Sequence, residues 1–142
     1  MTTPPRPAPA TDLRVLVCGG REFFDAAAVD RVLDRVHRLR GIALVIHGEA
    51  TGADTLAHQW AVGAGVPIEG YPADWHAHGL SAGMRRNHMM LREGQPDVVI
   101  AFPGGIGTAM MIEIAGRAGV PVWAPYGQET PHEALARLRS RA

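Results

Sequence analysis

Short apolar runs alternate with segments of helical periodicity along most of the chain. Residues 13–18 and 42–47 are rich in β-branched side chains and nearly continuous in their apolar character, which is typical of buried strands. Three further runs of this kind cover residues 66–71, 97–102 and 120–124. The pattern therefore predicts five short strands, each followed by a turn that contains glycine or proline.

The segments between these runs have apolar residues at helical spacing. Asp25 is placed to cap a helix that ends at Gly41, and Gly65 ends the helix predicted for residues 53–64. Further helices are predicted for residues 84–93 and 108–118, and Thr130 with Glu133 has the spacing of a capping box before a last helix. Residues 72–83 are predicted to be irregular.

Strands that alternate with helices form a parallel sheet covered on both faces, with right-handed crossovers. We therefore predict an α/β fold, a Rossmann-like three-layer sandwich with a mainly parallel sheet of roughly five strands. Residues 12–142 are expected to form this single domain. Residues 1–11 contain four prolines and little that can be buried, which predicts a disordered tail.

Composition narrows the functional classes. The 142 residues include 14 positive and 14 negative side chains, and no basic block interrupts their even distribution, so binding of nucleic acid is disfavoured. The single cysteine, Cys18, lies in an apolar run and is expected to be a packed thiol. No run approaches the roughly 18 apolar residues that span a bilayer. These features predict a cytoplasmic protein with no membrane partner.

In parallel sheets of this kind, ligands bind outside the carboxyl ends of the strands, so the turns that leave the strands are the candidate site. The turn FPGGIGT places three glycines before a helix, where backbone N–H groups and the helix dipole favour an anion. Thr108 is predicted to cap that helix and to offer its hydroxyl to a phosphate. The predicted binding residues of this turn are Pro103, Gly104, Gly105, Gly107 and Thr108.

Two other turns meet the same edge of the predicted sheet. In CGGREF, Arg21 is suited to a phosphate or carboxylate and Glu22 to a ribose or base, although both residues are equally ordinary on a surface. In HGEATGAD, Asp54 either contacts the ligand or complements a helix N-terminus. Because three such turns meet at one edge of the sheet, we favour the ligand-binding role for these residues. The predicted binding residues of these turns are Gly19, Gly20, Arg21, Gly48, Gly52 and Asp54.

A pair of adjacent arginines opens the helix at residues 84–93. On a helix, Arg85 and Arg86 diverge by about 100°, so only one faces the sheet edge, and we prefer Arg86 together with Asn87. His76 and His78 precede this helix, but no third ligand has suitable spacing, so no metal site is predicted.

Two familiar nucleotide-binding motifs do not fit. A Walker P-loop requires a lysine, and this chain contains none. A dinucleotide fingerprint would place its third small residue at Met110, and the acidic residue expected about twenty positions later is missing. We therefore predict no bound cofactor.

The ordered motifs GGREF, HGEATGADTLA, YPADWHAHGLSAG, RRNHMM and DVVIAFPGGIGTA cover the chain from Arg14 to about Ala124. Together they resemble the DUF2493 family, the YspA-like branch of the SLOG superfamily. The resemblance implies a Rossmann-like fold that binds a nucleotide or nucleotide-like ligand, as a sensor or a processing module. The superfamily includes LOG phosphoribohydrolases and DprA single-strand DNA binders, and its members commonly pair, which implies a homodimer. The apolar helix at residues 108–118 could serve as a dimer face as well as a core helix.

LOG enzymes place an Arg-Lys pair before a PGGxGTxxE turn and cleave the base from a nucleoside 5'-monophosphate. The matching arginine here is Arg86, but the glutamate position holds Met111, whose thioether cannot act as an acid or stabilise an oxocarbenium ion. Nucleotide binding is therefore our first hypothesis. LOG-like hydrolysis and DprA-like DNA binding are the alternatives. Catalysis would need another acid, and the candidate catalytic residues are Glu22, Glu49, Asp54 and Arg86.

Overall fold

The computed structural model describes residues 12–127. Five strands alternate with helices, as the apolar pattern predicts. In chain order the elements are β1 (Leu13–Cys18), α1 (Ala26–Leu39), β2 (Ile42–His47), α2 (Ala53–Ala64), β3 (Ile68–Gly70), α3 (Trp75–His78), a 3-10 turn (Gly79–Ser81), α4 (Ala82–Gly94), β4 (Val98–Ala101), α5 (Ile106–Arg117) and β5 (Val122–Trp123).

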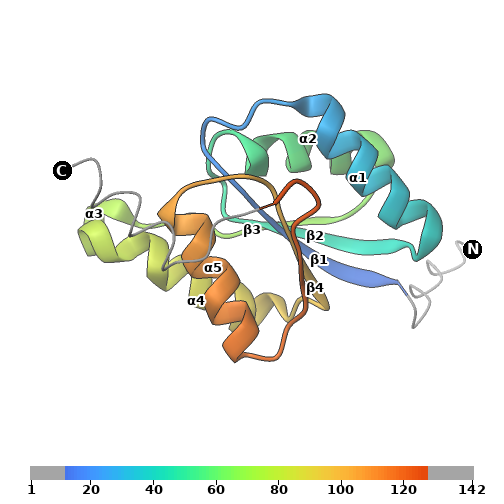
Figure 1. Cartoon of the computed structure of the whole chain (residues 1–142). Helices are drawn as coiled ribbons and strands as arrows, with labels where there is room; N and C mark the ends of the chain where they lie inside the picture. The colour runs from blue at the N-terminus through green and yellow to red at the C-terminus, as the bar shows by residue number, and fades with distance from the viewer. Residues whose placement is uncertain (1–11, 128–142) are drawn as a thin grey trace, which may run out of the picture.

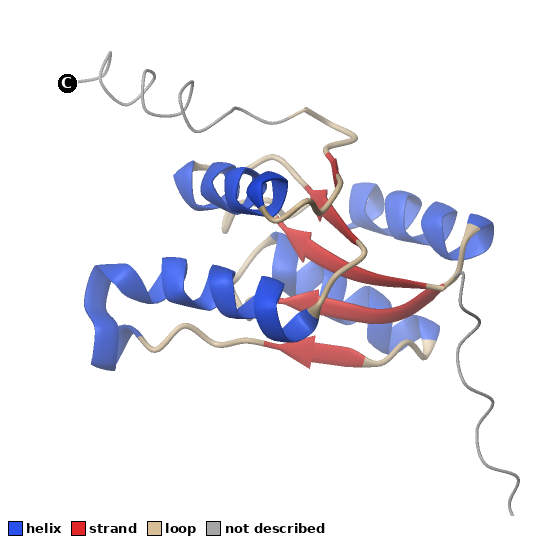
Figure 2. Cartoon of the chain, turned by 90° about the horizontal axis from the view of Figure 1, so that it is seen from below, coloured by secondary structure: helices blue, strands red, loops and turns tan. Residues whose placement is uncertain are grey.

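All five strands are parallel and lie in the order β3-β2-β1-β4-β5. Helices α1 and α2 cover one face of the sheet and α4 and α5 cover the other (Figures 1 and 2). The predicted α/β Rossmann-like architecture is thus confirmed. The strand order reverses between β1 and β4, and this switch point is where such sheets leave a crevice for ligands.

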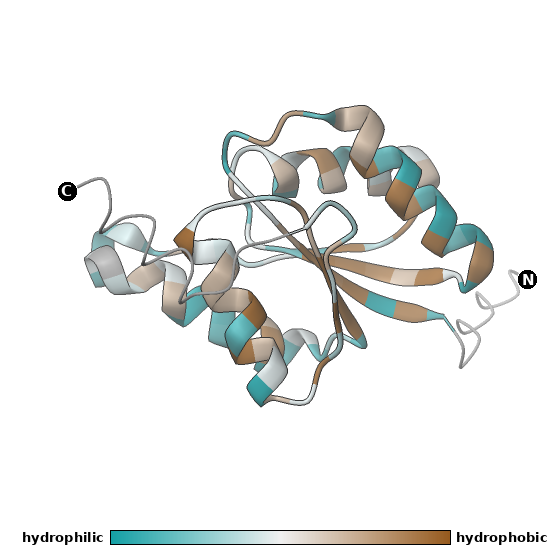
Figure 3. Cartoon of the chain, in the orientation of Figure 1, coloured by the Kyte–Doolittle hydropathy of each residue, from teal (hydrophilic) through white to brown (hydrophobic). Residues whose placement is uncertain are grey.

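Side chains of β1 alternate between two apolar layers. Val15 and Val17 pack with α1 and α2, whereas Leu16 and Cys18 pack with α4 and α5. Because both faces are covered, the strands are mainly apolar, with Arg14, His47 and Glu69 as their polar positions. The hydrophobic band runs through the centre of the molecule, while polar residues mark the outer side of α1 (Figure 3).

Two predicted helix ends are confirmed. The Asp25 carboxylate accepts a hydrogen bond from the Ala28 N–H at 3.0 Å and caps α1, and Gly65 ends α2 in the left-handed conformation. The prediction that residues 72–83 are irregular is wrong from Trp75 onward. Asp74 caps the short helix α3, a 3-10 turn follows, and α4 already begins at Ala82.

Two sequence predictions fall on residues outside the described part of the chain. They are the proline-rich tail, residues 1–11, and the helix after Thr130. The domain prediction, residues 12–142, is covered as far as residue 127. Across residues 12–127, no helix has both the length and the apolar character that crossing a bilayer requires.

Candidate functional site

A cavity of about 930 Å³ opens at the carboxyl ends of β1 and β4. Its lining comes from the end of β1, the β1–α1 and β4–α5 turns, the first turns of α4 and α5, the β2–α2 region (Ala50 and Asp54) and Trp75 of α3. The cavity therefore lies at the switch point of the sheet, where the topology predicts a ligand.

The β4–α5 turn forms one side of this cavity. Gly105 is the N-cap of α5, and no side chain within residues 12–127 caps this helix. The N–H groups of its first turn therefore lie at the cavity lining without an intrahelical partner. The prediction that Thr108 caps α5 is wrong, because the helix begins at Ile106 and Thr108 is its third residue. Thr108 is buried and still lines the cavity.

Glycines in this turn have two different reasons to be glycine. A Cβ at Gly104 would overlap the Thr108 hydroxyl and would lie 2.6 Å from the Gly20 nitrogen. Gly20 in turn donates its N–H to the Pro103 carbonyl at 2.9 Å, so these two turns are packed together. A Cβ at Gly105 or Gly107 would meet nothing within 4 Å. Packing does not require glycine there, whereas the close approach of a ligand would.

Arg86 faces the cavity from α4, and Arg85 does not. Arg86 is half-buried, and its Nη1 donates to the Gly48 carbonyl at 2.8 Å while its Nε donates to Asn87 Oδ1 at 3.3 Å. Burial lowers the pKa of Arg86, but a guanidinium remains charged in proteins. Arg85 is exposed and donates only to Ser81 in the described structure, at 3.2 Å. Asn87 is buried and lines the cavity beside Arg86.

Asp54 is a buried carboxylate in the first turn of α2. Its Oδ2 accepts hydrogen bonds from the N–H groups of Gly48 at 3.0 Å and Ala50 at 3.2 Å, which fixes the β2–α2 turn. Burial raises the pKa of Asp54 to about 6, although these hydrogen bonds and the nearby Arg86 oppose the rise. The side chain also lines the cavity. The site therefore contains a carboxyl group that changes charge near neutral pH.

Three residues predicted for the site do not line the cavity. Glu49 adopts a left-handed backbone conformation, with φ of 57°, and its side chain lies against Gly70 at the end of β3. Gly48 makes room for the Arg86 side chain, since a Cβ there would lie 2.7 Å from Arg86 Cδ. Gly52 has φ of 78° and packs against the Gly20 carbonyl. The two glycines support the site and Glu49 lies outside it.

The remaining predicted residues of the first turn do line the cavity. Arg21 and Glu22 are exposed at its rim, beside Gly19 and Gly20. Cys18 lies deeper in the cavity lining. It is a buried thiol whose pKa is raised by burial and by the nearby Asp54, as expected for a packed cysteine and not for a nucleophile.

Sequence reasoning missed Trp75. This residue of α3 lines the cavity, and Arg21 lies over its ring. The predicted irregular segment hid it, although the aspartate directly before it is a recognisable helix cap. The predicted absence of a metal stays a prediction. In residues 12–127, no three His, Cys, Asp or Glu side chains gather closely enough to hold an ion.

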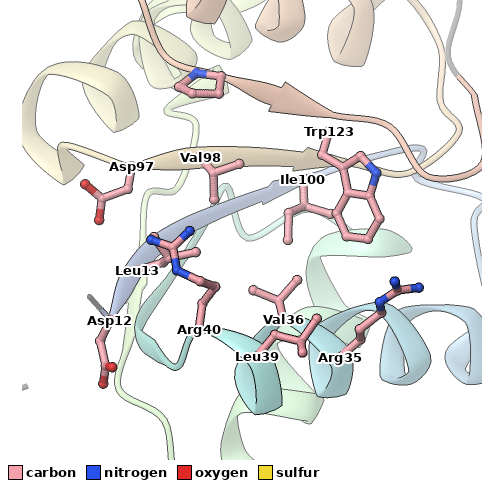
Figure 4. A pocket seen from close by; sticks show the side chains of 11 residues that line it. Asp12, Leu13, Arg35, Val36, Leu39, Arg40, Asp97, Val98, Ile100 and Trp123 are labelled. Carbon is pink, nitrogen blue, oxygen red and sulfur yellow. The ribbon is translucent and has the colours of Figure 1, made fainter. Parts of the chain in front are cut away.

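A second cavity, of about 570 Å³, lies between α1 and the strands β1, β4 and β5 (Figure 4). Apolar side chains line it, from Leu13, Val36, Leu39 and Trp123. Its charged lining residues include Asp97, Arg35 of α1 and Arg40 at the end of α1. It is placed toward the amino ends of β1 and β4 and contains no glycine-rich turn. The first cavity is therefore the better candidate site.

Comparisons with known proteins support this fold and identify a family. The YspA, cpYpsA-related SLOG family matches residues 13–78. The Gene 61 protein of Mycobacterium phage D29 is 42% identical over 117 residues, which cover 77% of this chain and 93% of that protein. The X-ray structure of DNA processing protein A (DprA) from Streptococcus pneumoniae superposes with a TM-score of 0.60 at 18% identity. That match covers 90% of this chain and 56% of DprA, so this chain spans little more than half the length of that protein.

The chain belongs to the YspA, cpYpsA-related SLOG family, as the resemblance of its motifs implies. The likeness to DprA shows the shared α/β fold.

Proposed function

We propose that the protein binds a nucleotide or a nucleotide-derived ligand, with a phosphate at the N-terminus of α5 and at Arg86. The observation that carries this proposal is the start of α5, which no side chain of the described residues caps and which lines the switch-point cavity together with a half-buried guanidinium. Helix N-termini and arginines are two standard partners of phosphate. Membership of the SLOG family supports a nucleotide-related ligand.

The rest of the cavity suits the remainder of a nucleotide. The carboxylates of Asp54 and Glu22 are acceptors for ribose or base, and Arg21 adds a second cation at the rim. Methionines from α4 and α5 form an apolar side. They are Met84, Met90, Met110 and Met111.

The test is a thermal-unfolding screen of the full chain against nucleoside mono-, di- and triphosphates, ribose 5-phosphate and a short labelled single-stranded DNA. A binding phosphate ligand should raise the melting temperature by mass action. Arg86→Ala should abolish this rise, whereas Arg85→Ala, which changes an exposed neighbour, should keep it. A rise with DNA alone, or no response to the whole panel, would contradict the proposal.

One observation favours a second candidate, the hydrolysis of an N-glycosidic bond in a nucleoside monophosphate. Asp54 is buried in the cavity with its pKa raised to about 6, which suits a general acid or base near neutral pH. Met111, at the position of the LOG glutamate, is only 1% exposed and packs in the core, so the acid would have to be Asp54 or Glu22. The test is release of free base from AMP. It should be lost in Asp54→Asn if this candidate is right, and absence of any release from the wild-type chain would exclude it.

The homodimer stays part of the proposal. The sequence leaves α5 open as a dimer face or as a core helix, and its residues Met111, Ile114 and Ala115 pack in the core against the sheet. The mass of the protein in solution, measured by light scattering, tests the dimer without reference to this helix.

A further inference from the structure

Trp75 is an aromatic side chain that the proposed function leaves unused. It belongs to α3, is 46% exposed, and lines the same cavity as the β4–α5 turn. Covering this ring with a bound group would be favourable, because burial removes apolar surface from water. Its place in the cavity lining indicates that the covering group is a ligand.

The surroundings of the indole fix its position. Asp74 caps α3 by accepting a hydrogen bond from the Ala77 N–H at 3.0 Å. On α4, a Cβ at Gly83 would lie 3.3 Å from the Trp75 Cη2 atom, so the bare glycine leaves just enough room for the edge of the ring. The indole is therefore held at its backbone and at one edge.

Arg21 contacts the ring from the other side of the cavity. Its guanidinium carbon lies 5.2 Å from the centre of the Trp75 ring, in a cation–π contact. Arg21 belongs to the β1–α1 turn, whereas Trp75 leads into α4, so the pair spans the mouth of the cavity. This contact shows that one face of the indole accepts a flat, positively polarised group from the cavity. Because Arg21 is exposed and keeps alternative partners in solvent, it is easily displaced.

A nucleobase has the shape and polarity to take this position. Bases stack on tryptophan faces with little preference for sequence, because each base offers a π-face. Met84, which also lines the cavity, extends the apolar surface around the ring. A sugar phosphate with no base would leave this surface uncovered.

We propose that Trp75 forms a base-stacking subsite, in which the base of the ligand replaces the Arg21 guanidinium over the indole. This inference rests on the proposed function and sharpens it. The ligand carries an aromatic heterocycle in addition to a phosphate, and the released Arg21 is free to turn toward the phosphate.

The experiment compares the affinities of AMP, GMP, CMP, UMP and ribose 5-phosphate for the full chain and three variants. Trp75→Ala should weaken binding of the nucleotides at least about tenfold, the range expected for loss of one stacked base, and should leave ribose 5-phosphate unchanged. Trp75→Phe keeps an aromatic face and should retain most of the affinity. Trp123→Phe is the matched control, because Trp123 lies in the second cavity (Figure 4).

Tryptophan fluorescence gives an independent readout. Nucleotides should quench the emission of the wild-type chain and of Trp123→Phe, but not that of Trp75→Phe. Thermal unfolding without ligand checks that the Trp75 variants are folded.

The outcomes separate the two proposals. If ribose 5-phosphate and nucleotides bind the wild-type chain and Trp75→Ala equally well, or if Trp75→Ala weakens both kinds of ligand to the same degree, the stacking subsite is overturned and phosphate binding stands. If neither kind of ligand binds the wild-type chain, the proposed function itself fails, and the subsite fails with it.

Discussion

Replacing Asp54 with asparagine should remove a pH dependence of stability that the wild-type chain carries. Asp54 is buried, and burial raises the pKa of its carboxyl group to about 6, from an ordinary value of 3.8. As the pH rises from about 4 to about 6, the unfolded chain therefore releases this proton before the folded chain does. The stabilisation that the protonated carboxyl group contributes is complete below pH 3.8, its ordinary pKa, and is lost as the pH rises through about 6, its pKa in the folded chain.

The size of the effect follows from the two pKa values. Each pH unit between them corresponds to about 1.4 kcal/mol, so the complete loss is about 3 kcal/mol. Of this, about 2 kcal/mol falls between pH 4.5 and pH 7.5, which is an accessible range. The asparagine side chain of the variant has no charge to bury, and its amide oxygen can still accept the hydrogen bonds from Gly48 and Ala50.

Urea unfolding of the wild-type chain and of Asp54→Asn at several pH values measures this difference. Other titrating groups are common to both proteins, so the difference between their free energies of unfolding isolates Asp54. The variant should gain about 2 kcal/mol relative to the wild type from pH 4.5 to pH 7.5. If the difference between the two free energies of unfolding stays constant with pH, the inference that burial disfavours the ionised form of Asp54 is refuted.

Three further predictions concern other positions. Gly107→Leu and Gly116→Leu both add a side chain where a Cβ meets nothing within 4 Å, so both variants should unfold at or above the wild-type temperature. Only Gly107 lines the cavity, so only Gly107→Leu should weaken ligand binding at least about tenfold. Gly52→Ala should lower the free energy of unfolding by about 3 kcal/mol or more, because its φ is 78° and the new Cβ would overlap the Gly20 carbonyl; a loss under about 1 kcal/mol in urea would contradict this. His47 is buried beside His58, and burial lowers its pKa to about 4. Its ring should therefore stay neutral in NMR spectra down to about pH 5. The stabilisation from the neutral ring is complete above about pH 6.5 and should be lost as the pH falls toward 4. A ring that titrates near pH 6.5 would contradict that burial.

The fold could be predicted because its signals are local. The strands β1 and β2 have the predicted bounds, since a continuous β-branched run bounded by turns leaves little choice. The prediction was less accurate toward the sheet edge. Strand β5 is only two residues long because its pairing with β4 is limited to Val122 and Trp123, and pairing length depends on a neighbour that the local sequence does not encode.

Only the part of the site that is formed by turns at the strand ends could be predicted from the sequence. Turns that follow β1 and β4 meet at the switch point in any sheet of this topology, which is why the glycines of both turns line one cavity. Glu49 lies elsewhere because its left-handed backbone turns the side chain toward Gly70. The position of Trp75 at the cavity depends on how α3 packs on α4. This is a tertiary contact, and no periodic pattern in the sequence predicts it.

The most direct test of the phosphate site at α5 is a titration of the ¹⁵N-labelled chain with a nucleoside monophosphate, followed by amide NMR. We expect the largest shifts on the N–H groups of Ile106, Gly107 and Thr108, at the start of α5, and we expect Arg86→Ala to remove them. Residues around the second cavity, such as Leu13 and Val98, should not respond. Shifts centred on the second cavity, or no shifts at the start of α5 at saturating nucleotide, would contradict a phosphate site at this turn.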